Sequence, residues 1–165
     1  MIEFNEDKLM EYCIATEIKI QYKKNYKAAE RPQIRESKDI YTIFNSIRKY
    51  NDKYTNEMDI REFFFALYLN KTNKIIAWKE ISSGSNCGCV CDIQTIIRNA
   101  LLLGVSSIIV CHNHPSGNLK ASETDKKLTE RLKEAVKLLD MELLDHIILG
   151  EIDGAYVSMC NEGLM

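Results

Sequence analysis

The chain has 165 residues, of which 45% are hydrophobic, so it can form one well-packed core but is short for two ordinary domains. Its formal net charge of −2 and its pI near 6.0 give no global electrostatic case for binding nucleic acid or an anionic membrane. The first thirty residues carry charged side chains throughout, and no apolar run is long enough to span a bilayer, which predicts a cytoplasmic protein without membrane contact.

The N-terminal segment is expected to form a strand and a basic loop that pack on the core. Apolar and polar residues alternate over residues 12–22, as in a strand with one apolar face, and Arg31-Pro32 predicts a loop after it. Basic side chains outnumber acidic ones over residues 18–35: Lys19, Lys23, Lys24, Lys27, Arg31 and Arg35. We interpret them as a solvated strand end and loop in preference to a nucleic-acid patch. Residues 1–36 would then join residues 37–165 in one globular unit.

Two helices and a hairpin are predicted in the first half of that main body. Ser37 is placed to cap a helix that runs to about Tyr50. Its inner stripe would consist of Ile40, Ile43, Phe44 and Ile47. The polar stretch 51–59 predicts a connector, and residues 62–70 and 75–82 predict an antiparallel hairpin. Asp92 can cap a second helix through Leu103, which Gly104 would end.

The second half is expected to complete a mixed sheet with helices packed on it, which makes the fold α/β with mixed strand directions. Residues 106–111 form a short apolar run typical of a buried strand. A helix is predicted from Ser122 to about Leu139, followed by a strand over 145–149. A turn at Asp153-Gly154 and a short strand over 155–158 would end the domain.

Six cysteines, at positions 13, 87, 89, 91, 111 and 160, are expected to be thiols in a reducing compartment. Cys87, Cys89 and Cys91 alternate, but they lack the Cys-x-x-Cys spacing of common zinc sites. We interpret these three as small residues before a helix in preference to a second metal or redox site.

Two histidines and a carboxylate have the spacing of a metal site. His112 and His114 are two residues apart at the end of the predicted strand, so both side chains point the same way. Asp125 falls in the first turn of the helix capped by Ser122, on its buried stripe, where a carboxylate needs a partner or a cation. Two imidazole nitrogens and one carboxylate oxygen suit Zn²⁺ and leave a fourth position open for water.

A base for that water is the remaining requirement, and Glu80 is the candidate. It lies in a strand-like run, residues 75–81, where it would share a face with Ile76 and Trp78. Glu80 would take a proton from the water, and the hydroxyl of Ser122 would donate to the developing oxyanion.

The order Glu80, His112-x-His114, Ser122-x-x-Asp125 resembles the JAMM motif of JAB/MPN metallopeptidases. The string His112-Asn-His-Pro-Ser-Gly-Asn and the later Leu143-Leu-Asp-His-Ile-Ile-Leu-Gly resemble the RadC-like bacterial branch. Over roughly residues 38–165 this resemblance implies a JAB1/MPN-like fold, which is also cytidine deaminase-like. It further implies a zinc-dependent peptide or isopeptide hydrolase, with the ligands and catalytic residues assigned above. A DNA-repair or mobile-element context follows from the resemblance alone.

Other functions remain open at this stage. A metal-dependent nuclease or DNA-associated protein is one alternative, but the letters of HNH nucleases are spread over a ββα unit and are not adjacent as in His112-Asn113-His114. A non-catalytic zinc-binding scaffold is another. A base deaminase is excluded because the His-x-Glu and Pro-Cys-x-x-Cys patterns are missing from the sequence. We expect His146 to be structural or to support a ligand, and Ser116 and Asn118 to shape a loop near the metal. The substrate and the oligomeric state are not predicted.

Overall fold

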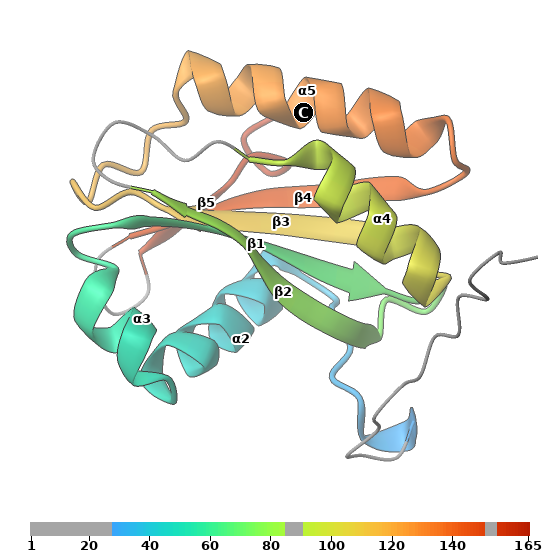
Figure 1. Cartoon of the computed structure of the whole chain (residues 1–165), viewed down its shortest axis with the longest axis horizontal. Helices are drawn as coiled ribbons and strands as arrows, with labels where there is room; N and C mark the ends of the chain where they lie inside the picture. The colour runs from blue at the N-terminus through green and yellow to red at the C-terminus, as the bar shows by residue number, and fades with distance from the viewer. Residues whose placement is uncertain (1–27, 85–90, 151–154) are drawn as a thin grey trace, which may run out of the picture.

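The computed structural model describes residues 28–84, 91–150 and 155–165, which form a five-stranded mixed sheet with helices on both faces (Figure 1). The strand order is β2-β1-β3-β4-β5, in which β3 and β4 are parallel and the other neighbours are antiparallel. The strands are β1 Glu62–Leu69, β2 Ile75–Gly84, β3 Ser107–Asn113, β4 Glu142–Leu149 and β5 Tyr156–Ser158. The predicted mixed α/β fold is therefore confirmed.

Helices α2 (Ser37–Lys49) and α3 (Asp52–Glu57) cover one face of the sheet, and α4 (Ile93–Leu103) and α5 (Glu123–Lys137) cover the other (Figure 1). A single turn of 3₁₀ helix, η1 (Ala28–Glu30), precedes α2. No helix within the three described ranges is long and apolar enough to cross a membrane.

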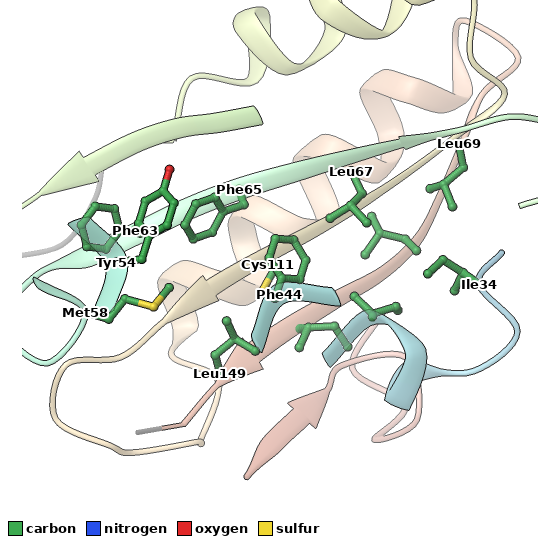
Figure 2. Packing of buried hydrophobic residues seen from close by; sticks show 13 residues of the cluster. Ile34, Phe44, Tyr54, Met58, Phe63, Phe65, Leu67, Leu69, Cys111 and Leu149 are labelled. Atoms are coloured by element: carbon green, nitrogen blue, oxygen red, sulfur yellow. The ribbon is translucent and has the colours of Figure 1, made fainter. Parts of the chain in front are cut away.

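Strand β1 is buried on both faces, which explains its uninterrupted apolar sequence. Phe63, Phe65, Leu67 and Leu69 pack with residues of α2 and α3, including Phe44 and Tyr54, in the cluster drawn in Figure 2. The alternate residues Phe64, Ala66 and Tyr68 pack with residues of α4 and α5. The two faces of the sheet thus contact two separate hydrophobic layers. Side chains of one strand that alternate along the sequence therefore lie in different layers.

Two local predictions were wrong. The stretch 51–59, predicted as a connector, contains helix α3, whose cap Asn51 accepts from the backbone N–H of Lys53 at 3.1 Å. This helix buries only Tyr54, so its sequence carries no apolar stripe. Ser37 is the first residue of α2 and not its cap, because Glu36 occupies the cap position.

The other predicted elements are confirmed within a few residues. Asp92 caps α4 by accepting from the N–H of Thr95 at 3.2 Å, and Gly104 ends the helix with φ of 60°. Both members of the hairpin are present as β1 and β2. The predicted strand over 12–22, Cys87, Cys89, most of the basic stretch and the Asp153-Gly154 turn lie outside the described residues. The packing of residues 1–36 stays a prediction.

Candidate metal centre

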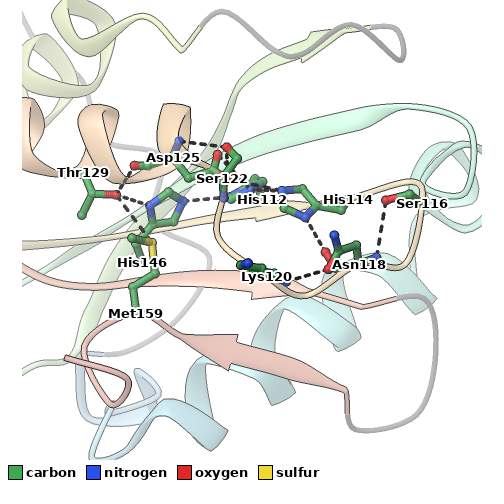
Figure 3. Close-up of polar contacts among 10 residues, drawn as sticks. All are labelled: His112, His114, Ser116, Asn118, Lys120, Ser122, Asp125, Thr129, His146 and Met159. Atoms are coloured by element: carbon green, nitrogen blue, oxygen red, sulfur yellow. Dashed lines mark hydrogen bonds and ion pairs between the residues drawn. The ribbon is translucent and has the colours of Figure 1, made fainter. Parts of the chain in front are cut away.

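The three predicted ligands meet at the C-terminal end of β3 (Figure 3). His112 and His114 leave the end of the strand, and Asp125 reaches them from the first turn of α5. The Nε2 atoms of the two histidines are 2.8 Å apart, and Asp125 Oδ1 is 3.4 Å from His112 Nε2. Asp125 Oδ2 is 3.5 Å from His114 Nε2. The spacing of these residues in the sequence therefore predicted a real convergence of side chains.

These distances fit a single zinc ion. Zinc–nitrogen and zinc–oxygen bonds of about 2.0–2.1 Å at the tetrahedral angle place ligand atoms about 3.3 Å from one another. The nitrogen–nitrogen separation is 2.8 Å, and the separations of 3.4 and 3.5 Å run to different oxygens of Asp125. One ligand atom from each residue lies within 4.8 Å of the other two. Two imidazole nitrogens and a carboxylate oxygen are also a donor set found in catalytic zinc sites. The group could thus hold a metal with one position left for water or substrate.

Ser122 lies at the site and holds Asp125 in place. Its backbone N–H and its hydroxyl both donate to Asp125 Oδ2, at 2.7 and 2.6 Å, and its oxygen accepts from the backbone N–H of Asp125 at 3.1 Å. This is the reciprocal capping box of α5. The hydroxyl proton is used by the carboxylate, so donation to an oxyanion requires the hydroxyl to rotate away from Asp125.

Burial and charge set the protonation of the ligands. Burial lowers the pKa of the fully buried His112 to about 4, which keeps its ring neutral. Burial alone would raise the pKa of Asp125, but the contacts with His114, His112 and Ser122 outweigh it and lower the pKa below its ordinary value. The hydrogen bond to Asp125 raises the pKa of His114. A neutral His112 and an ionised Asp125 are the states in which these groups bind metal.

In the metal-free protein, acidification from about pH 6.5 to pH 4 is expected to lower the free energy of unfolding. The pKa of His112 falls from 6.5 to about 4 on folding, so the unfolded chain binds this proton first. The resulting loss approaches about 1.4 kcal/mol per pH unit in that range. The lowered pKa of Asp125 acts in the same direction at lower pH. His114, with a pKa raised above 6.5, contributes stability that is lost only as pH rises above about 6.5, so it does not oppose the loss between pH 6.5 and pH 4.

Urea titrations with a chelator present, at several pH values, measure this slope. His112→Gln is the control and should show a smaller dependence over the same range. A free energy of unfolding that stays constant or increases on acidification would contradict the assignment of a neutral buried His112.

Glu80 does not lie at this site, so its predicted position was wrong. Its carboxylate accepts from Lys53 Nζ at 2.7 and 2.8 Å and from the hydroxyl of Tyr54 at 2.8 Å. Tyr54 packs edge-on against Phe65 in the layer beneath α2 and α3. His112 belongs to the opposite face of the sheet, where it stacks on Phe64. Glu80 therefore faces away from the metal ligands.

Irregular pairing of β2 explains why Ile76 does not share a face with Trp78 and Glu80, as was predicted. The β1–β2 register shifts twice, between Phe64 and Phe65 and between Tyr68 and Leu69. Trp78 contacts Tyr54 on the α3 side, as Glu80 does, whereas Ile76 packs with the opposite layer. Counting alternate residues along the sequence does not assign faces correctly across such shifts.

Glu62 is the carboxylate that sequence reasoning missed. It is the first residue of β1 and lines a cavity of about 710 Å³ together with His114, Ser122 and Asp125. Its charge contributes to the raised pKa of His114. One sequence signal could have drawn attention to it: Glu62 is the one charged residue of an otherwise apolar buried strand. The antiparallel pairing of β1 with β3, which brings the start of β1 to the end of β3, is visible only in the structure.

Asn113 has a structural role between the two histidines. Its Oδ1 accepts from the backbone N–H of Phe63 at 2.8 Å. Its Nδ2 donates to the carbonyl oxygens of Met58 at 2.7 Å and Arg61 at 2.8 Å. The side chain thus fastens the segment that leads into Glu62 onto β3. It points away from the ligands, which agrees with the interpretation that the His-Asn-His string is unrelated to HNH nucleases.

The loop after His114 borders the cavity, as expected for Ser116 and Asn118. The carbonyl oxygen of Asn118 accepts a hydrogen bond from His114 Nδ1, which leaves Nε2 facing the other ligands. Ser116 Oγ accepts from the backbone N–H of Asn118 at 3.4 Å. Both residues therefore shape the loop and lie within reach of a bound molecule. Among the described residues, Cys91, Cys111 and Cys160 form no disulfide bond.

The fold and the placement of the ligand group at the end of the parallel strand pair are those of a JAB/MPN-type domain. A family model described as the RadC-like JAB domain matches residues 34–164, close to the span over which the sequence motifs suggested this resemblance. The chain belongs to the RadC-like JAB domain family.

Individual relatives agree with this assignment. A UPF0758 protein of Flavobacterium johnsoniae is 36% identical over 132 residues, which cover 80% of this chain and 53% of that protein. A UPF0758 protein of Clostridium acetobutylicum is 35% identical over 143 residues, or 86% of this chain and 58% of the relative. A UPF0758 protein of Methanosarcina mazei is 36% identical over 133 residues, or 81% and 54%. The chain spans about half the length of these relatives, and their names state no activity.

Proposed function

We propose that the chain is a zinc-dependent hydrolase that cleaves a peptide or isopeptide bond with a water molecule. The observation that supports this most is a cavity lined by two members of the three-ligand group, His114 and Asp125, and by a separate carboxylate, Glu62. His112, His114 and Asp125 would hold the zinc. When bound, zinc lowers the pKa of water toward neutrality and polarises a carbonyl group.

The side chains around the cavity would provide the acid–base chemistry. In this proposal Glu62 replaces Glu80 as the general base. It would take a proton from the attacking water as the new carbon–oxygen bond forms, and would give that proton to the amine nitrogen as the carbon–nitrogen bond breaks. Ser122 would keep Asp125 aligned through two hydrogen bonds of 2.6 and 2.7 Å. Its donation to an oxyanion stays a prediction.

The cavity suits a peptide better than a polynucleotide. Its volume of about 710 Å³ is typical of small-molecule and peptide sites. Its apolar lining includes Phe64 and Leu128, and its charged lining includes the acidic Asp59 and Glu62 against one lysine, Lys120. Carboxylates beside the metal would repel a phosphodiester backbone. The proposed partner is therefore a peptide or protein substrate. A metal-dependent nuclease and a non-catalytic zinc scaffold are the competing functions, and the expected cytoplasmic location stays a prediction.

Zinc-loaded protein incubated in H₂¹⁸O with a degenerate peptide library and with isopeptide-linked peptide pairs is expected to release products carrying one ¹⁸O in a new carboxylate. Mass spectrometry detects this label. Chelation should stop the reaction, because both the water and the carbonyl lose their activation, and added zinc should restore it.

Plasmid and single-stranded DNA are the parallel substrates in the same experiment. Metal-dependent DNA cleavage without amide cleavage would replace the proposal with the nuclease. A zinc-loaded protein that turns over none of these substrates would instead favour the scaffold.

A further inference from the structure

We infer that His146 is a positioning residue that fixes the proton of His112 on Nδ1 and so presents Nε2 as an unprotonated ligand. This inference rests on the metal-binding part of the proposed function and not on its catalytic part. His146 lies on β4, the parallel neighbour of β3, with its ring fully buried between the ligand group and α5 (Figure 3).

A continuous row of short hydrogen bonds joins His112 to α5. His112 Nδ1 is 2.8 Å from His146 Nε2, and His146 Nδ1 is 2.6 Å from Thr129 Oγ1. Thr129 Oγ1 is in turn 2.6 Å from the carbonyl oxygen of Asp125. The row therefore starts at one ligand, His112, and returns to the backbone of another, Asp125.

The far end of the row decides the direction of every bond in it. The carbonyl oxygen of Asp125, at 2.6 Å, can only accept, and so can the weaker acceptor Met159 Sδ at 3.7 Å, so the hydroxyl of Thr129 donates its single proton away from His146. The hydroxyl oxygen then accepts from His146, which places a proton on His146 Nδ1 and leaves Nε2 with a lone pair. That lone pair accepts from His112 Nδ1–H. A neutral imidazole carries one proton, so His112 Nε2 is bare and points at His114 and Asp125.

The surroundings of His146 leave no competing partner for its ring among the contacts of the described residues. Phe64 packs edge-on against it at 5.5 Å between ring centroids. The adjacent Asp145 directs its carboxylate elsewhere: to the hydroxyl of Ser158 at 2.6 Å and to the backbone N–H groups of His146 and Cys160. The ring thus bonds only along the row. Partners of this kind hold a ligand's tautomer and orientation in metalloproteins.

The first test is zinc affinity, measured by competition with a chromogenic chelator and without any substrate. Thr129→Val keeps the side-chain shape but removes the hydroxyl that sets the direction of the row, and His146→Leu removes the acceptor of His112 Nδ1. Both are expected to weaken zinc binding about 10- to 100-fold. Thr129→Ser, the matched control, restores the hydroxyl and should bind zinc close to the unmodified protein. Thr129→Val with the fold intact and undiminished affinity would overturn the inference.

The second test reads the tautomers directly. Long-range ¹H–¹⁵N correlation spectra of the histidine rings should show Nδ1 protonated in both His112 and His146, with and without zinc. A proton on Nε2 of His146 in both states would overturn the inference even if the affinities change. If the unmodified protein binds no zinc, the proposed function fails, and the tautomers in the metal-free protein decide this inference alone. If zinc binds but no substrate is cleaved, only the catalytic proposal fails.

Discussion

Replacing His112 or Asp125 with alanine is expected to reduce the zinc content of the purified protein from about one ion per chain to none. Three protein ligands define the site, and two do not hold zinc against a chelating buffer. One ligand atom from each of the three residues lies within 4.8 Å of the other two, and either substitution removes one of these atoms. Elemental analysis after dialysis against trace chelator measures the loss.

Two further variants separate metal loss from unfolding. Asp125→Asn keeps the size of a side chain that caps α5 but removes the charge that zinc needs, so it should also lose the metal. Asp52→Ala changes an exposed aspartate in the first turn of α3, and this variant should retain about one zinc ion per chain. Stoichiometric zinc in His112→Ala, with its fold intact, would show that the metal binds elsewhere.

Glu62→Gln is expected to retain zinc and to lose turnover about 10²- to 10⁴-fold, the usual contribution of a general base. The amide preserves the shape of the side chain but cannot accept the proton of the attacking water. Glu80→Gln is the matched control: its carboxylate bonds to Lys53 and Tyr54 on the other face of the sheet, so zinc content and turnover should change little. Zinc content and ¹⁸O incorporation are measured on the same preparations.

The turnover of the two variants also decides whether Glu62 or Glu80 is the general base. If Glu80→Gln lost turnover while Glu62→Gln remained active, the catalytic role predicted from the sequence would stand, and the placement of Glu62 beside the cavity would have no catalytic meaning. Loss of zinc in Glu62→Gln would make Glu62 a ligand and not a base.

The sequence predicted the convergence of His112, His114 and Asp125 because their geometry depends on short spacings. His112 and His114 share a direction by the alternation of a strand, and Asp125 faces them from the first turn of a helix that Ser122 begins. Each of these relations spans at most a few residues within one element. The loop between His114 and Ser122 is also short, which limits where the helix can start relative to the strand.

Glu62 and Glu80 could not be distinguished in this way because their positions depend on pairing between strands. The two register shifts of β2 change which side chains face α3, and the sequence gives no sign of them. The contact between His112 and His146 likewise requires the parallel alignment of β3 and β4, across 34 residues of sequence. His146 was expected to be structural or to support a ligand. Its contact with His112 Nδ1 favours the second role and identifies His112 as the ligand that it would support.

The three proposed ligands and their supporting side chains come from β3, α5, β4 and the loop that joins β3 to α5, whereas Glu62 comes from the hairpin β1–β2. Zinc would therefore bind only to chains in which these three elements have already assembled. By mass action it would shift the folding equilibrium toward them, by about 1.4 kcal/mol for each tenfold rise in free zinc above the dissociation constant. The metal would thus act as a folding ligand for one supersecondary unit, while the hairpin that carries the base would gain stability only through its contacts with that unit.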